Sequence, residues 1–129
     1  IKLSEFRGKV VFLNIWATWF PPCKAKMPGI QNLYENTDLK WINYVMVSTD
    51  KNFQDAKKYK SSHNYSFPIY RLGESMPDEL NSTYLPTTFI IGKKGNIEVL
   101  HKGMAQYDSD KFRNFLKELS GNDSVVTND

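Results

Sequence analysis

The chain has 129 residues, of which 40% are hydrophobic and 14% aromatic, and this composition is typical of one compact domain with a hydrophobic core. Its formal net charge of +3 is spread along the sequence without a dense Lys/Arg stripe, so we expect no nucleic-acid partner. No apolar run is long enough to span a membrane, and one cysteine with two histidines predicts neither an internal disulfide, nor a zinc site, nor another cofactor.

The first predicted elements are a strand and the helix that follows it. Val10–Trp16 is a nearly continuous β-branched and aromatic run, which is typical of a central strand covered on both faces. Pro21 and Pro22 then end the strand pattern and suit the first turn of a helix. Apolar residues at intervals of three and four predict one buried stripe, and Pro28 is expected to kink or interrupt this helix. The stripe consists of Cys23, Met27, Ile30, Leu33 and Tyr34.

The middle of the chain repeats this alternation of strand and helix. Trp41 to Ser48 predicts a second strand, and Asn52 to Ser62 predicts a mostly polar helix. The short segment Phe67 to Tyr70 and a polar stretch from Gly73 to Asn81 follow. A β-α-β-α order of this kind indicates an α/β fold.

An antiparallel hairpin and a last helix are predicted to close the domain. Thr87 to Ile91 and Ile97 to His101 are its strands, with turn residues between them. One apolar face predicts a helix from Asp108 to Leu119. We therefore expect a domain over residues 1–119, in which helices flank a central mixed sheet, and a polar C-terminal tail over residues 120–129.

Three segments of the sequence resemble one known family. Residues 16–28 read WATWFPPCKAKMP and resemble the active-site segment of the TlpA/ResA-like thiol-disulfide oxidoreductases except at two positions. Phe6–Val11 is similar to that family's approach to the central strand, and Leu85–Ile97 is similar to its proline loop and hairpin. The resemblance implies a thioredoxin-like fold with a cis-proline loop at Leu85–Pro86. Tryparedoxins, which also carry a Trp-Cys-Pro-Pro-Cys segment, are the alternative family.

The first departure from the family pattern is Phe20. In the family a Cys-Pro-Pro-Cys type motif lies at a helix N-terminus, where unpaired amides and the helix dipole favour a thiolate on the first cysteine. The second cysteine then resolves the mixed disulfide. Cys23 matches only this second position, and Phe20 stands at the first. Because Phe20 has no ionisable atom, we expect that ordinary dithiol exchange cannot begin here.

The second departure is Lys26, which stands where many members carry a glutamate that handles the proton of the buried cysteine. Lysine cannot act as that carboxylate. Two changes within a few residues indicate a natural degenerate paralogue, since an engineered trap would more often carry Ser or Ala at the first position. Asp50 ends a strand on the side where the sites of parallel sheets gather, and it is therefore a weaker functional candidate.

The resemblance also implies a groove for a protein or peptide partner. In active relatives the residue before the cis-proline pairs through its backbone with an extended substrate segment, and Leu85 holds that position. Trp19, Phe20, Leu85 and Pro86 would then line an apolar patch that binds substrate or partner. The alternative is that Trp19 packs locally and Phe20 covers a cavity.

Three functions remain open from the sequence. One is a thioredoxin-like domain that has lost dithiol exchange and binds a partner through the former substrate groove. Another is a weak monothiol redox enzyme that uses Cys23, although the preferred interpretation of this thiol is a small buried hydrophobe. The third is a structural domain of a larger protein. The resemblance implies a periplasmic or other extracytoplasmic location, with missing residues and a membrane anchor expected upstream of Ile1.

Overall fold

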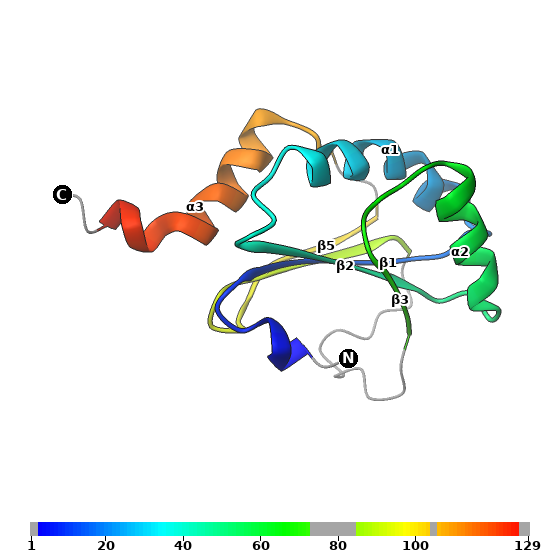
Figure 1. Cartoon of the computed structure of the whole chain (residues 1–129), viewed down its shortest axis with the longest axis horizontal. Coiled ribbons are helices and arrows are strands. Elements are labelled where there is room, and N and C mark those ends of the chain that lie inside the picture. Colours follow the sequence, from blue (N-terminus) through cyan, green and yellow to red (C-terminus); the bar gives the residue numbers. More distant parts are fainter. Residues whose placement is uncertain (1–2, 73–84, 104–105, 127–129) are drawn as a thin grey trace.

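The computed structural model describes residues 3–72, 85–103 and 106–126, which form an α/β fold around one mixed sheet (Figure 1). Its five strands follow the order β3-β2-β1-β4-β5. The strands are β1 (Val10–Trp16), β2 (Ile42–Ser48), β3 (Ile69–Arg71), β4 (Thr87–Ile91) and β5 (Ile97–Lys102). The helices in these ranges are α1 (Pro21–Glu35), α2 (Phe53–Ser62), α3 (Asp110–Val126) and the short 3-10 helix η1 (Leu3–Phe6). The predicted mixed sheet flanked by helices is confirmed.

Strand β1 lies at the centre of the sheet, with β2 parallel on one side and β4 antiparallel on the other. All seven of its residues are buried. Because side chains alternate across a strand, Phe12 and Trp16 belong to one hydrophobic cluster, whereas Leu13 and Ile15 belong to another. The prediction of a doubly covered central strand over Val10–Trp16 is confirmed.

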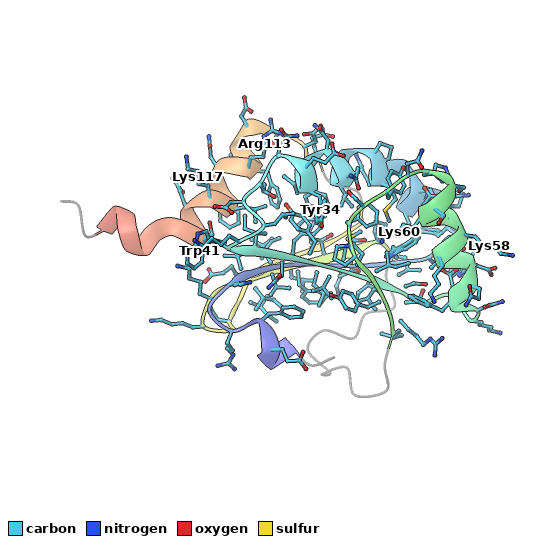
Figure 2. All side chains as sticks on the ribbon, in the orientation of Figure 1. Tyr34, Trp41, Lys58, Lys60, Arg113 and Lys117 are labelled. Atoms are coloured by element: carbon cyan, nitrogen blue, oxygen red, sulfur yellow. The ribbon has the colours of Figure 1, made fainter. Side chains whose placement is uncertain are left out.

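The first cluster, called the main core below, lies between the sheet and the three α-helices. Helix α2 contributes Ala56 to it and helix α3 contributes Leu116. Tyr34 of α1, labelled in Figure 2, packs edge-on against Tyr44 of β2, and the ring centroids are 5.1 Å apart. The buried members of the predicted α1 stripe are Cys23, Met27, Ile30 and Leu33. The spacing of the stripe therefore determines which face of α1 meets the sheet.

The second cluster lies on the opposite face of the sheet. Phe6 of η1 and Tyr70 of β3 pack against it from the side. Among the helices of the described ranges, none combines the length and the apolar character that a membrane crossing requires.

Of the two outcomes predicted for Pro28, a kink or an interruption, the interruption does not occur. The helix runs from Pro21 to Glu35 with Pro28 inside it. A proline inside a helix removes the hydrogen bond to the carbonyl four residues earlier, which belongs to Lys24. Both Pro28 and Lys24 are exposed, so water can solvate that carbonyl while the buried stripe holds the helix on the sheet.

Helix α3 begins slightly later and ends later than predicted. Ser109 precedes its first turn: the Ser109 side-chain oxygen accepts from the amide of Phe112 at 3.1 Å. The helix then continues past Leu119 to Val126, so most of the predicted polar tail is helical, and residues 127–129 lie outside the described ranges. The sequence pattern ended the helix too early because a polar segment shows no apolar stripe, although its backbone can still form helical hydrogen bonds. Figure 1 shows this end of α3 extending beyond the sheet.

The predicted hairpin is confirmed. Strands β4 and β5 pair antiparallel, with Thr87 opposite Lys102 and Phe89 opposite Leu100. The turn between them has Gly95 at a φ of +91°, a left-handed conformation that favours glycine. The polar stretch predicted from Gly73 to Asn81 lies outside the described residues.

Candidate functional site

The site begins at the N-terminus of α1. Phe20 is the N-cap, with extended backbone (φ −109°, ψ 106°), and its side chain makes no capping hydrogen bond. A capping side chain normally accepts from the amides of the second and third helical residues. Pro22 has no amide hydrogen, and the amide of Cys23 donates to the Phe20 carbonyl at 3.0 Å. The helix therefore begins without a polar capping side chain. An apolar side chain at the N-cap leaves no amide hydrogen unpaired at the second or third helical residue.

Trp19 and Phe20 differ in their exposure. The Trp19 side chain is 64% exposed, which makes it the most exposed of the large apolar residues in the described ranges. Phe20 is partly buried and packs against the main core. The two rings meet edge to face, with centroids 5.8 Å apart. Phe20 thus joins an exposed aromatic surface to the cluster that contains Cys23.

Cys23 is buried to 1% exposure and is not part of a disulfide. Burial raises the pKa of its thiol above the ordinary value of 9.0. A hydrogen bond with the backbone of Ala17 opposes this shift, and the negative charge of Asp50 adds to it. The protonated thiol is therefore favoured at neutral pH, and this form is a poor nucleophile.

Asp50 connects the end of β2 to the loop that leads into α1. It is 8% exposed and accepts hydrogen bonds from the hydroxyls of Thr18 and Ser48, both at 2.7 Å. The backbone amide of Thr18 also donates to this carboxylate, at 3.2 Å. The sequence indicated Asp50 only weakly and did not indicate Thr18 or Ser48. No local pattern identifies Thr18 because its partner lies 32 residues away.

The proline loop lies at the start of β4. The Leu85–Pro86 peptide bond is cis. Leu85 is partly buried and packs against both hydrophobic clusters, whereas Pro86 is buried. The Pro86 carbonyl accepts from the amide of Gly103 at 2.7 Å, and Gly103 has a φ of +96°. Phe20 and Leu85 thus border the same main core, while Trp19 lies at the surface beside Phe20.

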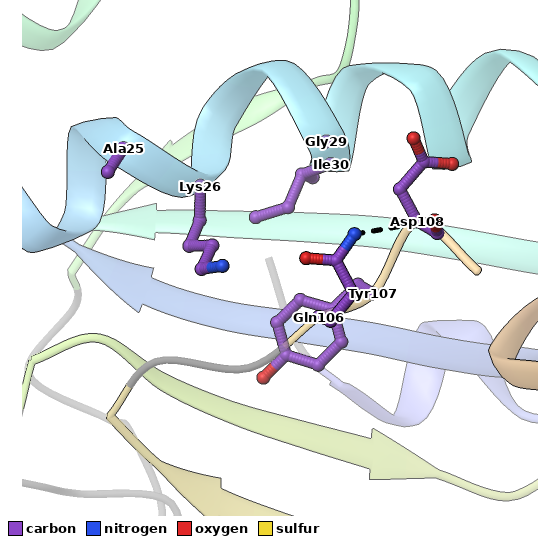
Figure 3. A pocket seen from close by; sticks show the side chains of 7 residues that line it. All are labelled: Ala25, Lys26, Gly29, Ile30, Gln106, Tyr107 and Asp108. Carbon is purple, nitrogen blue, oxygen red and sulfur yellow. Dashed lines mark hydrogen bonds between the residues drawn. The ribbon is translucent and has the colours of Figure 1, made fainter.

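Lys26 lies on α1, three residues after Cys23. It is partly buried and lines a cavity of about 180 Å³ between α1 and the segment that precedes α3 (Figure 3). The charged side chain that raises the pKa of the Cys23 thiol is Asp50. The structure thus places the two residues of the motif in different surroundings, with Cys23 in the main core and Lys26 at a cavity.

A buried polar pair lies on the same face of the sheet. Asn14 of β1 donates to the Thr88 side chain of β4 at 2.9 Å, and both residues are almost fully buried. The Asn14 side-chain oxygen and the Trp16 indole nitrogen have no hydrogen-bond partner among the described residues. The one polar residue inside the apolar run Val10–Trp16 was the signal that could have identified this pair from the sequence. Within the described ranges, no group of His, Cys, Asp and Glu side chains is placed to hold a metal ion.

The fold and the site define a thioredoxin-like domain, and comparison with known proteins gives its family. Residues 1–100 match the family model described as AhpC/TSA family. The thiol-disulfide oxidoreductase ResA of Oceanobacillus iheyensis is 31% identical over 121 residues, which cover 93% of this chain and 62% of that protein. ResA of Bacillus subtilis is 30% identical over 125 residues, which cover 94% of this chain and 70% of that protein.

A solved structure supports the same assignment. The structure described as a thiol:disulfide interchange protein DsbE of Chlorobium tepidum superposes with a TM-score of 0.78 at 25% identity, covering 94% of this chain and 86% of that one. The chain therefore belongs to the AhpC/TSA family and, within it, to the TlpA/ResA-like thiol-disulfide oxidoreductases. It spans between 62% and 70% of the length of the two ResA relatives.

Proposed function

We propose that this chain is a thioredoxin-like domain that does not catalyse dithiol-disulfide exchange and that binds an extended peptide of a partner protein beside Phe20 and Pro86. The observation that carries the proposal is the state of the motif. Its single cysteine is buried to 1% exposure, and the N-cap position before it holds an aromatic ring. Exchange needs an accessible thiolate to attack the substrate disulfide and a second thiol to release the mixed disulfide. The 129 residues contain one cysteine in total.

A monothiol reaction at Cys23 has less support. The sulfur would have to reach a substrate disulfide, but Cys23 is 1% exposed and belongs to the main core. Burial also raises the pKa of this thiol, which lowers the fraction of thiolate at neutral pH. Both effects act against attack, so we assign Cys23 a packing role.

The binding surface is argued from exposure and from the family resemblance. Trp19 presents a largely exposed ring next to Phe20, and a large exposed aromatic side chain is typical of binding surfaces. In the family, the residue at the position of Leu85 pairs with an extended segment through its backbone. A peptide that pairs there would cover the apolar side chains around it, and it would need no thiol.

Two measurements test this proposal. Reduction of insulin by dithiothreitol is expected to be no faster with the protein than with a Cys23→Ala variant. S-alkylated insulin B chain, used as an extended peptide without free thiols, is expected to bind saturably in isothermal titration calorimetry. Trp19→Ala should abolish this binding, whereas Trp41→Phe should retain it, because Trp41 is also exposed but lies between Lys40 and Lys93 next to the start of β2.

Either of two results would contradict the proposal. Turnover that depends on Cys23 would show that the site is a monothiol enzyme. Equal peptide binding by the wild type and Trp19→Ala would exclude the surface around Trp19 and favour a purely structural role in a larger protein.

We further propose that residues 1–119 act as the domain outside the cytoplasm, with a membrane anchor upstream of Ile1. The support is membership in the ResA-like family. Fusion of the complete gene product to alkaline phosphatase tests the location, since that reporter is active only after export. An inactive fusion of a stable protein would contradict it.

A further inference from the structure

A cavity separate from the peptide groove lies between α1 and the segment before α3. Its volume is about 180 Å³, several times the roughly 30 Å³ that one water molecule occupies in the liquid. Lys26, Gly29 and Ile30 line it from α1, and Gln106, Tyr107 and Asp108 line it from the other side (Figure 3). Gly29 allows this close approach, because a Cβ atom there would lie 3.6 Å from the Cβ of Asp108. None of these residues belongs to the surface around Trp19 and Pro86.

Lys26 is the uncompensated charge of this cavity. Its side chain is partly buried, and it makes no ion pair or hydrogen bond with any residue that the structure describes. The carboxylate of Asp108, which also lines the cavity, is already engaged by Arg113 at 2.5 Å and by Asn32 at 2.8 Å. An amine at the wall of a cavity, without an acceptor among the described residues, favours an anionic ligand there.

The orientation of Gln106 adds to this arrangement. Its amide nitrogen donates to the backbone carbonyl of Asp108 at 3.5 Å, and Figure 3 shows the amine of Lys26 turned toward the Gln106 side chain. The Tyr107 ring closes the cavity toward the sheet and is 8% exposed. The cavity thus combines one amine with amide and aromatic walls.

We propose that this cavity binds a carboxylate group, with the amine of Lys26 as its charged hydrogen-bond donor. One cation matches one negative charge, whereas phosphate groups are typically held by several donors or by the planar fork of arginine. The volume admits the carboxylate and a few adjoining atoms. The carboxylate belongs either to a small free acid or to the chain terminus of a partner, and these two sources present the same chemistry to Lys26.

Titration with sodium acetate, followed by NMR of the ¹⁵N-labelled protein, tests the site, with sodium chloride at equal ionic strength as reference. The amide signals of Lys26, Gly29 and Gln106 are expected to shift saturably with acetate and not with chloride. Lys26→Gln should weaken binding about tenfold, as expected for loss of a charge-assisted hydrogen bond. Lys24→Gln, an exposed position on the same helix, should bind as the wild type does, and Lys26→Arg should retain most of the affinity.

The two sources are separated by a pair of short peptides, one with a free C-terminal carboxylate and one with a C-terminal amide. If only the free-acid peptide competes with acetate, the site binds the chain terminus of a partner. If neither peptide competes, the site binds small acids. Shifts that do not saturate, or equal affinity in Lys26→Gln, would overturn the proposal. Trp19→Ala must leave acetate binding unchanged, so failure of the groove and failure of this cavity are distinguishable.

Discussion

Phe20→Cys is expected to create a redox-active pair with Cys23. Side chains three residues apart on a helix have Cβ atoms about 5–6 Å apart, and a disulfide needs roughly 3.5–4.5 Å. Phe20 is the N-cap with an extended backbone, and its amide donates to the Ala17 carbonyl at 3.4 Å and not to a carbonyl of the helix. A modest rotation at this residue therefore brings the two sulfurs together, while the buried stripe holds Cys23 in place.

The expected change in stability follows from the burial of Phe20. Full truncation of a buried phenylalanine costs about 3–5 kcal/mol, and since Phe20 is only partly buried and cysteine fills some of its space, we expect a loss of about 1–3 kcal/mol. A disulfide that closes a loop of four residues returns about 2 kcal/mol in the chain-entropy description. The oxidised variant should therefore unfold near the wild type, and the reduced variant at lower urea concentration. A domain of this size, stable by about 5–15 kcal/mol, remains folded in both states.

The assay is mass spectrometry after oxidation, followed by insulin reduction. Bridge formation appears as loss of the two thiol hydrogens, and Phe20→Cys combined with Cys23→Ala is the control that cannot close a bridge. We expect Phe20→Cys to reduce insulin more slowly than Phe20→Cys with Lys26→Glu, because a carboxylate can take the proton of the buried thiol. A variant that keeps the native circular dichroism spectrum yet closes no bridge would refute the alignment of Phe20 with the missing nucleophile.

Four further predictions concern stability and reactivity. Asp50→Asn should lower the free energy of unfolding by about 1–3 kcal/mol, since an amide group then faces the donors of Thr18, and an unchanged urea midpoint would contradict this. An alkylating probe should modify Cys23 far more slowly in the native protein than in urea. Burial raises the pKa of the Cys23 thiol above the ordinary 9.0, so this group contributes its full stabilisation below pH 9 and progressively less as the pH rises above it. Cys23→Ala should therefore flatten the decline of stability at alkaline pH. Leu116→Ala should cost about 2–5 kcal/mol by calorimetry, and a loss below about 1 would show that α3 is not docked as described.

Local patterns predicted most of the elements correctly. The apolar run Val10–Trp16 gave the central strand, and the turn residues before Ile97 gave the hairpin, because each pattern depends on neighbours in the sequence. The same reasoning allowed an interruption at Pro28 that does not occur, since the packing of a buried stripe outweighs the cost of a proline inside the helix. It also ended the last helix at Leu119, whereas α3 continues to Val126.

The residues of the site could be predicted from the sequence only within the segments that resemble the family. The motif around Phe20 and Cys23 is contiguous in the sequence, so its position at a helix start followed directly. The contact between Thr18 and Asp50 joins residues 32 positions apart, and it depends on the parallel pairing of β1 with β2. The cavity at Lys26 likewise depends on a segment some distance along the chain that only the folded protein brings to α1.

The missing nucleophile and the buried thiol of the motif are both connected with Phe20. Phe20 lacks a thiol, and the same ring packs against the main core that encloses Cys23. Burial is the largest contribution to the raised pKa of Cys23, so the packing of the main core favours the protonated thiol. Under the proposed function, one aromatic ring at the N-cap takes the place of the nucleophile, borders the core that buries the remaining thiol and packs against the exposed ring of Trp19.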